Sequence, residues 1–303
     1  MYKNNNILIT GGYGFLGSYL YDELKKRGYE YINRFHSSEF DLTVKEDVLK
    51  MYIKYSPGTV IHLAAVVGGI GENRKNPGKF IYDNLMMGTH LIHEGRNIYD
   101  KFVMVGTVCS YPKHCPTPFK EYDIWNGYPE ETNAPYGIAK KTLVQMLQSY
   151  NTQYAVKGIS IIPTNLYGIN NRDDTHVIPQ MINRFVEAIR ADAPKITLWG
   201  SGNVFREFLH VKDAAVGIII GMEEGESGDI LNIGSGDRYS IKELAALIAE
   251  YTGYKGEIVW DASQPDGQPD RLVDITRISN LGFKKQENFE ESLKELVQWR
   301  KLK

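Results

Sequence analysis

Residues 7–17 read Ile-Leu-Ile-Thr-Gly-Gly-Tyr-Gly-Phe-Leu-Gly, and this stretch decides the fold. Its apolar beginning, Ile7–Thr10, is typical of a buried strand. Apolar side chains then recur at helical spacing over residues 16–24, and Gly28 follows as a stop signal. The stretch therefore predicts a strand, a tight glycine turn and a helix, in that order.

The three glycines of this turn meet three separate needs. Gly11 allows a tight turn at the strand end, Gly14 lets backbone N–H groups approach a pyrophosphate, and Gly17 lets the helix pack closely on the strand. Their place between a predicted strand and a predicted helix distinguishes a dinucleotide site from a merely structural turn. We expect NAD(P) to contact Gly11, Gly14, Phe15, Leu16 and Gly17.

The same alternation continues through the first half of the chain. Strands are predicted over residues 29–33, 59–63, 101–105 and 158–162, and helices over residues 45–55, 82–99 and 136–153. Alternating elements of this kind form a parallel sheet with helices on both faces. The predicted fold class is α/β, a Rossmann-type doubly wound parallel sheet.

The pattern changes in the second half. Segments 169–210 and 237–268 are richer in turns, whereas residues 211–233 predict a helix and a strand that return to the sheet. We therefore expect an NAD(P)-binding domain of residues 1–168 plus 211–236. A smaller, mainly C-terminal α/β lobe of residues 169–210 plus 237–303 is expected to bind the substrate.

Composition excludes several classes of partner. A formal net charge of -2 gives no broad basic field, which argues against nucleic acid and anionic membranes. The only cysteines, Cys109 and Cys115, form neither a disulfide framework nor a zinc set, so we expect no metal. No long apolar run and no signal-peptide pattern is present, which predicts a cytoplasmic protein.

The end of the second predicted strand bears on the choice of cofactor. An NAD-specific site usually places Asp or Glu there, but this strand ends in Asn33-Arg34. Arg34 suits a 2′-phosphate and favours NADP(H); NAD(H) stays open if Arg34 is only a solvated surface residue. Four further positions are predicted to contact the cofactor: the pair Asp41-Leu42 at the adenine and the small residues Ala64 and Ala65.

The helix that begins near Tyr136 carries the clearest catalytic signal. Tyr136 and Lys140 are four residues apart, so both lie on one helix face. Lys140 can lower the phenol pKa and hold the nicotinamide ribose, and Tyr136 can then give a proton to a carbonyl that receives hydride. Thr107, just past a predicted strand, can hydrogen-bond the same carbonyl oxygen.

At these residues the chain resembles the extended short-chain dehydrogenases, and most closely the GDP-L-fucose synthase family. The resemblance covers nearly the whole chain. The strings that carry it are Val67–Ile70, Gly106–Lys113, Asn133–Tyr136, Pro163–Gly168, His176–Pro179, Arg206–His210 and Pro265–Gly267.

The resemblance implies epimerisation of a GDP-4-keto-6-deoxy sugar at C3 and C5, followed by reduction of C4 with NADPH. Inversion needs one group to remove a proton and another to return it on the opposite face, and Cys109 and His176 match that pair. Two alternatives stay open. Cys109 could be a small buried residue behind Thr107, and His176 could be a helix cap or a pocket wall.

Further contacts follow from the same resemblance. Pro163, Asn165 and Leu166 are expected at the nicotinamide half of the cofactor. The GDP portion is expected to contact Arg184, Trp199, Arg206 and Arg271. Long short-chain dehydrogenases usually dimerise through a four-helix bundle, so we expect a homodimer through helices 82–99 and 136–153.

The match departs from the family at the substrate end. The loop 169–175 is short, Gln264 stands where Lys is common, and Asp270 stands where Arg is common. The second strand is followed by Phe35-His36 instead of further basic residues. These differences leave open a C4 reductase or dehydrogenase of another GDP-sugar, such as a GDP-heptose, without epimerisation. A non-catalytic nucleotide sensor is the third hypothesis.

Overall fold

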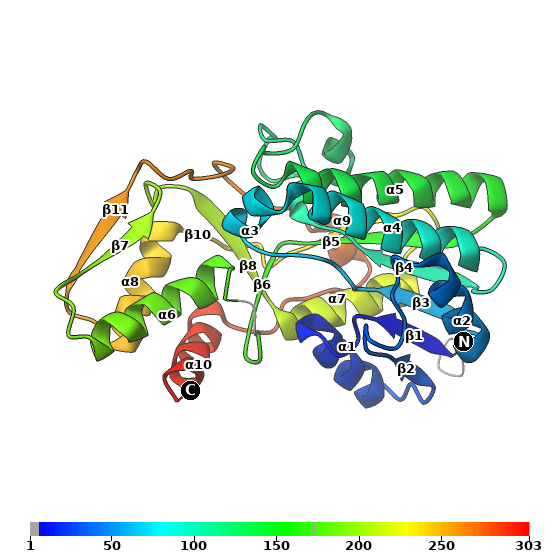
Figure 1. The fold of residues 1–303 in the computed structure, drawn as a ribbon, viewed down its shortest axis with the longest axis horizontal. Helices are drawn as coiled ribbons and strands as arrows, with labels where there is room; N and C mark the ends of the chain where they lie inside the picture. The colour runs from blue at the N-terminus through cyan, green and yellow to red at the C-terminus, as the bar shows by residue number, and fades with distance from the viewer. Residues whose placement is uncertain (1–5, 172–173, 303) are drawn as a thin grey trace.

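The computed structural model describes residues 6–171 and 174–302. Its centre is a six-stranded sheet in the order β2-β1-β3-β4-β5-β9, in which every pair of neighbours is parallel (Figure 1). The strands are β1 (Ile7–Thr10), β2 (Ile32–Arg34), β3 (Thr59–His62), β4 (Lys101–Val105), β5 (Lys157–Pro163) and β9 (Ile230–Ile233).

Helices cover both faces of this sheet (Figure 1). The helices on one face are α1 (Phe15–Lys26) and α7 (Val211–Glu224), and those on the other are α2 (Lys45–Tyr55), α4 (Pro77–Gly95) and α5 (Ala134–Tyr154). The alternation within β1 shows why both faces need cover. Ile7 and Ile9 pack into the core under α1 and α7, and Leu8 packs into the opposite core.

The order of the strands reverses between β1 and β3, because the chain adds β2 on one side of β1 and then β3 on the other. Ligands of doubly wound sheets bind outside the carboxyl ends of the strands at such a point. Gly11 directly follows β1, and Ala64 lies two residues after the end of β3. A dinucleotide is therefore expected beside these two residues.

A smaller lobe holds two more sheets, a third core and the C-terminus (Figure 1). One sheet has the order β10-β8-β6 and the other pairs β11 with β7. The strands are β6 (Asn165–Tyr167), β7 (Lys195–Trp199), β8 (Phe205–His210), β10 (Arg238–Ser240) and β11 (Glu257–Asp261), and the helices are α6 (Val177–Arg190), α8 (Ile241–Thr252) and α10 (Phe289–Lys301). Short helices complete the fold: α3 (Ile70–Lys75), η1 (Val108–Ser110), η2 (Glu121–Trp125) and α9 (Thr276–Asn280).

The predicted fold class is confirmed, and the predicted elements of the six-stranded sheet and its helices differ from the structure only at their ends. The segments 169–210 and 237–268, predicted to be rich in turns, contain the helices α6 and α8. The strand predicted from residue 29 begins at Ile32, because the Tyr29 N–H donates to the Leu24 oxygen at 3.1 Å in the turn that ends α1. The helix predicted over 82–99 begins at Pro77, which suits a first turn, and ends at Gly95. The two-lobe division stays a prediction, with β6 paired to β8 in a sheet of the smaller lobe.

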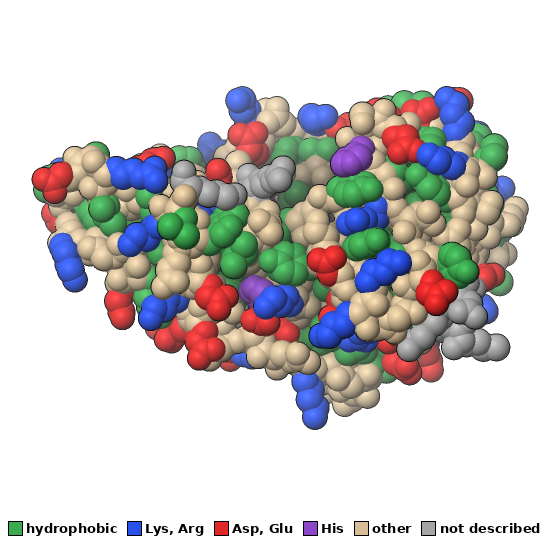
Figure 2. Space-filling model, turned by 90° about the horizontal axis from the view of Figure 1, so that it is seen from below, with side chains coloured by type: hydrophobic (Ala, Val, Ile, Leu, Met, Phe, Trp, Pro, Cys, Tyr) green, Lys and Arg blue, Asp and Glu red, His purple; other side chains and the backbone are tan. Residues whose placement is uncertain are grey.

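The surface fits the low net charge. Acidic and basic side chains are interspersed on the face shown in Figure 2. Within residues 6–171 and 174–302, no helix is both long and apolar enough to cross a membrane.

Candidate active site

The glycine turn after β1 leaves no space for side chains. Gly11 has φ +70°, and a Cβ there would lie 2.8 Å from the Ala64 nitrogen. The Gly14 N–H donates to the Gly11 oxygen at 2.9 Å, and a Cβ on Gly17 would lie 2.3 Å from that same oxygen. The turn therefore needs glycine at both ends, and it brings the start of α1 against the ends of β1 and β3 as a dinucleotide requires.

A pocket of about 270 Å³ opens beside the turn. It brings together five residues predicted for the cofactor, namely Gly11, Gly14, Asp41, Leu42 and Ala64. Its other lining residues are Tyr13, Phe35, His36, Ser37, Phe40 and Met87. An aromatic and aliphatic wall with one carboxylate at its edge suits an adenosine, so the residues present fit a dinucleotide.

Arg34, at the end of β2, lies between two tyrosine rings. Its guanidinium is 3.5 Å from the centre of the Tyr21 ring and 4.4 Å from that of Tyr13, and Nη1 donates to the Gly12 oxygen at 3.3 Å. Tyr13 in turn stacks on His36, with ring centres 4.1 Å apart. Arg34 is thus held against the glycine turn by cation–π contacts, and His36 is the neighbouring basic group that lines the pocket.

Thr107, Tyr136 and Lys140 meet where β4 ends and α5 begins. Thr107 caps η1, and its Oγ1 accepts the Cys109 N–H at 3.2 Å. Burial raises the pKa of Tyr136, Cys109 raises it further, and a hydrogen bond with Thr107 lowers it. Burial lowers the pKa of Lys140 to about 8, and its Nζ donates to the Val105 oxygen at 3.1 Å. The phenol is therefore protonated and ready to donate.

Gly137 sets how closely α5 approaches η1. A Cβ at this position would lie 2.2 Å from the Cys109 oxygen, and the Ser110 hydroxyl donates to the Gly137 oxygen at 2.9 Å. The glycine next to Tyr136 is thus what allows the thiol-bearing turn to pack beside the phenol. No signal in the sequence marks Gly137 for this role.

The Cys109 side of the site is bounded by a buried arginine pair. Burial lowers the pKa of Arg206 to about 9, Arg271 lowers it further, and Cys109 raises it. Arg206 Nη2 donates to the Asp266 oxygen at 2.9 Å, and a Cβ on Gly267 would lie 3.3 Å from the same nitrogen. The predicted residues Arg206 and Arg271 are therefore close to each other and to the thiol, where paired cations can hold a diphosphate.

His176 is the residue directly before α6, at the N-cap position. Its side chain makes no capping hydrogen bond, so the helix-cap alternative does not describe it, and it has contacts elsewhere. The preceding residue fastens the loop to the other side of the site: the Gly69 N–H donates to Thr175 Oγ1 at 2.8 Å. The string Val67–Ile70 and the His176 loop therefore meet in space, although the sequence separates them widely.

Arg184 and Trp199 form a second pair, on the smaller lobe. The Arg184 guanidinium lies 5.9 Å from the Trp199 ring centre, and its Nη1 donates to the Thr197 oxygen at 2.7 Å. Trp199 is 47% exposed, which leaves its indole face available to a base or sugar. The four residues predicted for GDP thus fall into two pairs: half-buried Arg184 with exposed Trp199, and the buried arginines Arg206 and Arg271.

The strand end at the predicted nicotinamide half is tied to β8. Asn165 Nδ2 donates to the Glu207 backbone oxygen at 2.9 Å, and Leu166 pairs with Leu209. Pro163 ends β5. The Glu207 carboxylate is fully buried and accepts the N–H groups of Gly236 and Val273 at 2.8 and 2.9 Å. Burial raises the pKa of this carboxyl to about 7.

The acid that departs from the family pattern has a local partner. Asp270 forms an ion pair with Arg238 on β10. Asp266, four residues before it, accepts the Ser201 N–H at 2.7 Å and the Ser201 hydroxyl at 2.8 Å. The negative charge of Asp270 is thus neutralised within the smaller lobe, which reduces its conflict with a nearby diphosphate.

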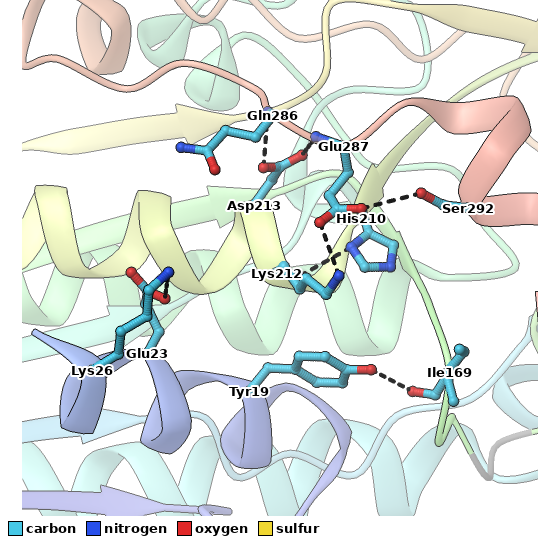
Figure 3. A network of polar contacts seen from close by, with 10 residues as sticks. All are labelled: Tyr19, Glu23, Lys26, Ile169, His210, Lys212, Asp213, Gln286, Glu287 and Ser292. Carbon is cyan, nitrogen blue, oxygen red and sulfur yellow. Dashed lines mark hydrogen bonds and ion pairs between the residues drawn. The ribbon is translucent and has the colours of Figure 1, made fainter. Parts of the chain in front are cut away.

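A network of polar contacts joins α1 to the smaller lobe (Figure 3). The Tyr19 hydroxyl donates to the Ile169 oxygen at 3.1 Å, and its ring meets that of His210 edge-on. Lys212 pairs with Glu287 at 2.9 Å, just before α10. The helix that follows the cofactor turn is therefore linked to the loop that leads to His176.

Comparison with known proteins assigns the family. Residues 7–234 match the NAD dependent epimerase/dehydratase family. GDP-L-fucose synthase of Escherichia coli (strain K12) is 37% identical over 310 residues, which cover 98% of this chain and 97% of that one. The chain belongs to the GDP-L-fucose synthase group of this family. The predicted resemblance and the predicted class, an NAD(P)-dependent oxidoreductase, are confirmed.

One further relative and two solved structures are similar to the chain over nearly its whole length. GDP-L-colitose synthase of Yersinia pseudotuberculosis is 33% identical, with 97% of each chain covered. A GDP-mannoheptose C4 reductase from Campylobacter jejuni with NADP bound superposes with a TM-score of 0.89 at 30% identity, and 99% of each chain is covered. A GDP-L-fucose synthetase from Naegleria fowleri bound to NADP gives a TM-score of 0.85 at 27% identity, covering 97% of this chain and 93% of that one.

Proposed function

We propose that the chain is an NADP-dependent epimerase-reductase of a GDP-4-keto-6-deoxy sugar, which inverts C3 and C5 and then reduces the C4 ketone. The observation that carries the proposal is the position of Cys109. Its thiol lies close enough to Tyr136 and Arg206 to shift the pKa of both. A proton-transfer group thus lies near both the predicted proton donor at C4 and the predicted diphosphate ligand.

Reduction needs a hydride and a proton, and NADPH supplies the hydride when bound. Tyr136 donates the proton to the C4 oxygen, since burial keeps its phenol protonated. Thr107, hydrogen-bonded to Tyr136, hydrogen-bonds the same oxygen and orients the ketone. Lys140 lies one helical turn from Tyr136, and its buried ammonium group favours the negative charge that develops on the phenol oxygen as the proton leaves.

Epimerisation uses the acidity that the C4 ketone gives to the hydrogens on C3 and C5. Cys109 and His176 divide the two proton transfers, one removing a proton and the other returning it on the opposite face. Thr107 hydrogen-bonds the enolate oxygen during both inversions. The non-catalytic alternative leaves this convergence of Thr107, Tyr136 and Lys140 unexplained.

The preference for NADP rests on the end of β2. Arg34 is the predicted 2′-phosphate ligand, and His36 adds a second basic group at the same rim. Two structurally similar proteins carry NADP in their structures, the GDP-mannoheptose C4 reductase and the GDP-L-fucose synthetase.

A second candidate function is reduction of a GDP-4-keto-heptose. Two observations favour it: the similarity to the GDP-mannoheptose C4 reductase, and the replacement of a usual family cation by Asp270, which pairs with Arg238. A larger sugar would place an additional hydroxyl group near this end of the site.

NADPH oxidation with a matched panel separates these candidates. The panel holds GDP-4-keto-6-deoxymannose, a GDP-4-keto-heptose and the corresponding free sugars, and products are identified by NMR. We expect the highest kcat/KM for the 6-deoxy ketone, with inverted C3 and C5 in the product. A higher kcat/KM for the heptose, with C3 and C5 retained, would replace the first candidate by the second.

We also propose a homodimer in which α4 and α5 of each copy form a four-helix bundle. The two helices pack against each other, and Tyr82 on α4 remains 58% exposed. Sedimentation should give twice the chain mass of 34.4 kDa at micromolar concentration; a mass of one chain contradicts the dimer. A cytoplasmic location is proposed with it, because Cys109 must stay reduced to act, and both cysteines are free.

A further inference from the structure

The C-terminal helix reaches into the region of His176 through one buried side chain. Arg300, near the end of α10, has only 7% of its side chain exposed. Its Nη1 donates to Asp174 Oδ1 at 2.7 Å and to Asn183 Oδ1 at 2.8 Å, and Nη2 donates to the Asn171 oxygen at 3.0 Å. One guanidinium therefore contacts three separate parts of the chain around the start of α6.

These contacts bracket His176 along the chain. Asp174 lies two residues before His176, and Asn183 lies about two helical turns after it on α6. A third fastening comes from the opposite side, where the Gly69 N–H donates to Thr175 Oγ1. The backbone that carries the His176 imidazole is thus held by contacts on both sides of His176 in the sequence and by the hydrogen bond from Gly69.

We propose that Arg300 is a positioning residue for epimerisation, which sets the place of His176 relative to C3 and C5 without touching the substrate. The inference rests on the proposed function, since it concerns a proton transfer by His176. It predicts that a change at Arg300 impairs proton exchange at carbon more than hydride transfer at C4, because Tyr136 and Thr107 are positioned by α5 and β4 instead.

The chemistry of the contacts favours positioning over simple stabilisation. Three acceptors around one planar fork define an orientation that a lysine ammonium on a flexible stem cannot reproduce. Among the residues that the structure describes, Arg300 Nε is buried and has no hydrogen-bond partner. A buried donor without an acceptor lowers stability. The position of the Arg300 guanidinium is therefore better explained by the loop and helix that it orients than by a gain in stability.

The test uses Arg300→Lys and Arg300→Met in the full-length protein, with Arg277→Lys as matched control. Arg277 also donates to a backbone oxygen, that of Ile230, and to a carboxylate, that of Asp229, but on α9, in contact with the larger sheet. Each protein is incubated with GDP-4-keto-6-deoxymannose and NADP⁺ in D₂O, and deuterium at C3 and C5 is followed by NMR. A second incubation with NADPH gives the reduction rate and the product configuration.

We expect exchange at C3 and C5 to fall about 10- to 100-fold in the Arg300 variants, the size expected for a small displacement of a catalytic group. NADPH oxidation should fall less, and the reduced product should shift toward retained C3 and C5. Asn183→Leu, which removes one acceptor and keeps Arg300, should shift the product in the same direction by less. The Arg277 control should match the wild type in both measurements.

Equal loss of exchange and reduction in a folded Arg300 variant overturns the inference, because that pattern marks general destabilisation. Normal exchange in Arg300→Met also overturns it. If the Arg300 variants do not fold, normal exchange in Asn183→Leu decides against it in their place. Absence of exchange in the wild type is a different result, since it contradicts the proposed function itself.

Discussion

The two ends of the candidate site are built in opposite ways. The cofactor end is local: Gly11 and Gly14 lie in the turn between β1 and α1, Gly17 lies in the first turn of α1, and their close contacts are with this segment and with Leu63 and Ala64. The substrate end is assembled from distant segments, since Cys109, His176 and Arg206 come from η1, the start of α6 and β8.

This difference indicates which half can diverge. A local turn has its geometry fixed by sterics within a few residues, so it tolerates little change. The substrate end depends on hydrogen bonds between separate elements, such as Gly69 to Thr175 and Arg206 to Asp266. One of its departures from the family pattern, Asp270, forms an ion pair with Arg238.

The largest expected effect comes from Tyr136→Phe, which removes the predicted proton donor of the substrate end and leaves the glycine turn unchanged. Reduction should fall about 10²- to 10⁴-fold, because the general acid is removed. NADPH affinity should stay within a few-fold, and exchange at C3 and C5 should continue. Steady-state kinetics and fluorescence titration with NADPH measure both quantities; near-normal turnover rules out the assignment of Tyr136.

The next effect concerns Glu207, at the junction of the two ends. Its pKa is raised to about 7 in the folded protein, from 4.5. A raised folded-state pKa stabilises the fold below the unfolded value, and this contribution is lost as the pH rises through 7. The shift corresponds to at most about 3 kcal/mol.

Glu207→Gln should therefore remove this pH dependence, whatever constant change in stability the amide introduces. Urea unfolding at several pH values between 5 and 8 measures it. The wild type should lose stability relative to the variant as the pH rises across this window. A difference that is constant with pH contradicts the raised pKa.

Gly17→Ala tests the sterics of the cofactor end. The new Cβ would lie 2.3 Å from the Gly11 oxygen, so α1 must move away from the turn. Overpacking of this kind is worth about 1–3 kcal/mol, or about 5- to 150-fold in NADPH affinity if expressed in binding. Gly71→Ala is the matched control, because a Cβ there meets nothing within 4 Å. Equal affinities for both variants would show that the close contact is irrelevant to binding.

The smallest effect is expected from Arg34→Ala. Loss of one charge-assisted hydrogen bond to a 2′-phosphate should reduce NADPH affinity about 10-fold or more and leave NADH affinity nearly unchanged. His36→Ala is the companion variant, since His36 lines the same pocket. If the ratio of NADPH to NADH affinity changes only in His36→Ala, the 2′-phosphate ligand is His36 and the assignment of Arg34 is wrong.

The sequence predicted local features well for a physical reason. Strand β4 and helix α2 have the predicted bounds, because alternation and helical spacing act over a few residues. The lining of the adenosine pocket was partly predictable, since Asp41 and Ala64 follow recognisable elements.

Contacts between distant residues could not be predicted in the same way. The sequence around Glu207 does not indicate that the N–H groups of Gly236 and Val273, which lie later in the chain, donate to its carboxylate. The cation–π contacts of Arg34 with Tyr21, and the bonds of Arg300 around His176, likewise depend on how elements pack. Such pairs become visible only when the tertiary arrangement is known.

The central claim, that one site carries out epimerisation and reduction with different proton-transfer groups, is tested by deuterium exchange in three variants. Cys109→Ser and His176→Gln are compared with Tyr136→Phe on GDP-4-keto-6-deoxymannose in D₂O. We predict slow exchange at C3 or C5 in the first two, with reduced product that retains its configuration, and continued exchange without reduction in the third. Normal exchange at both carbons in Cys109→Ser and in His176→Gln would contradict the claim, and would leave a simple C4 reductase with the two residues as pocket walls.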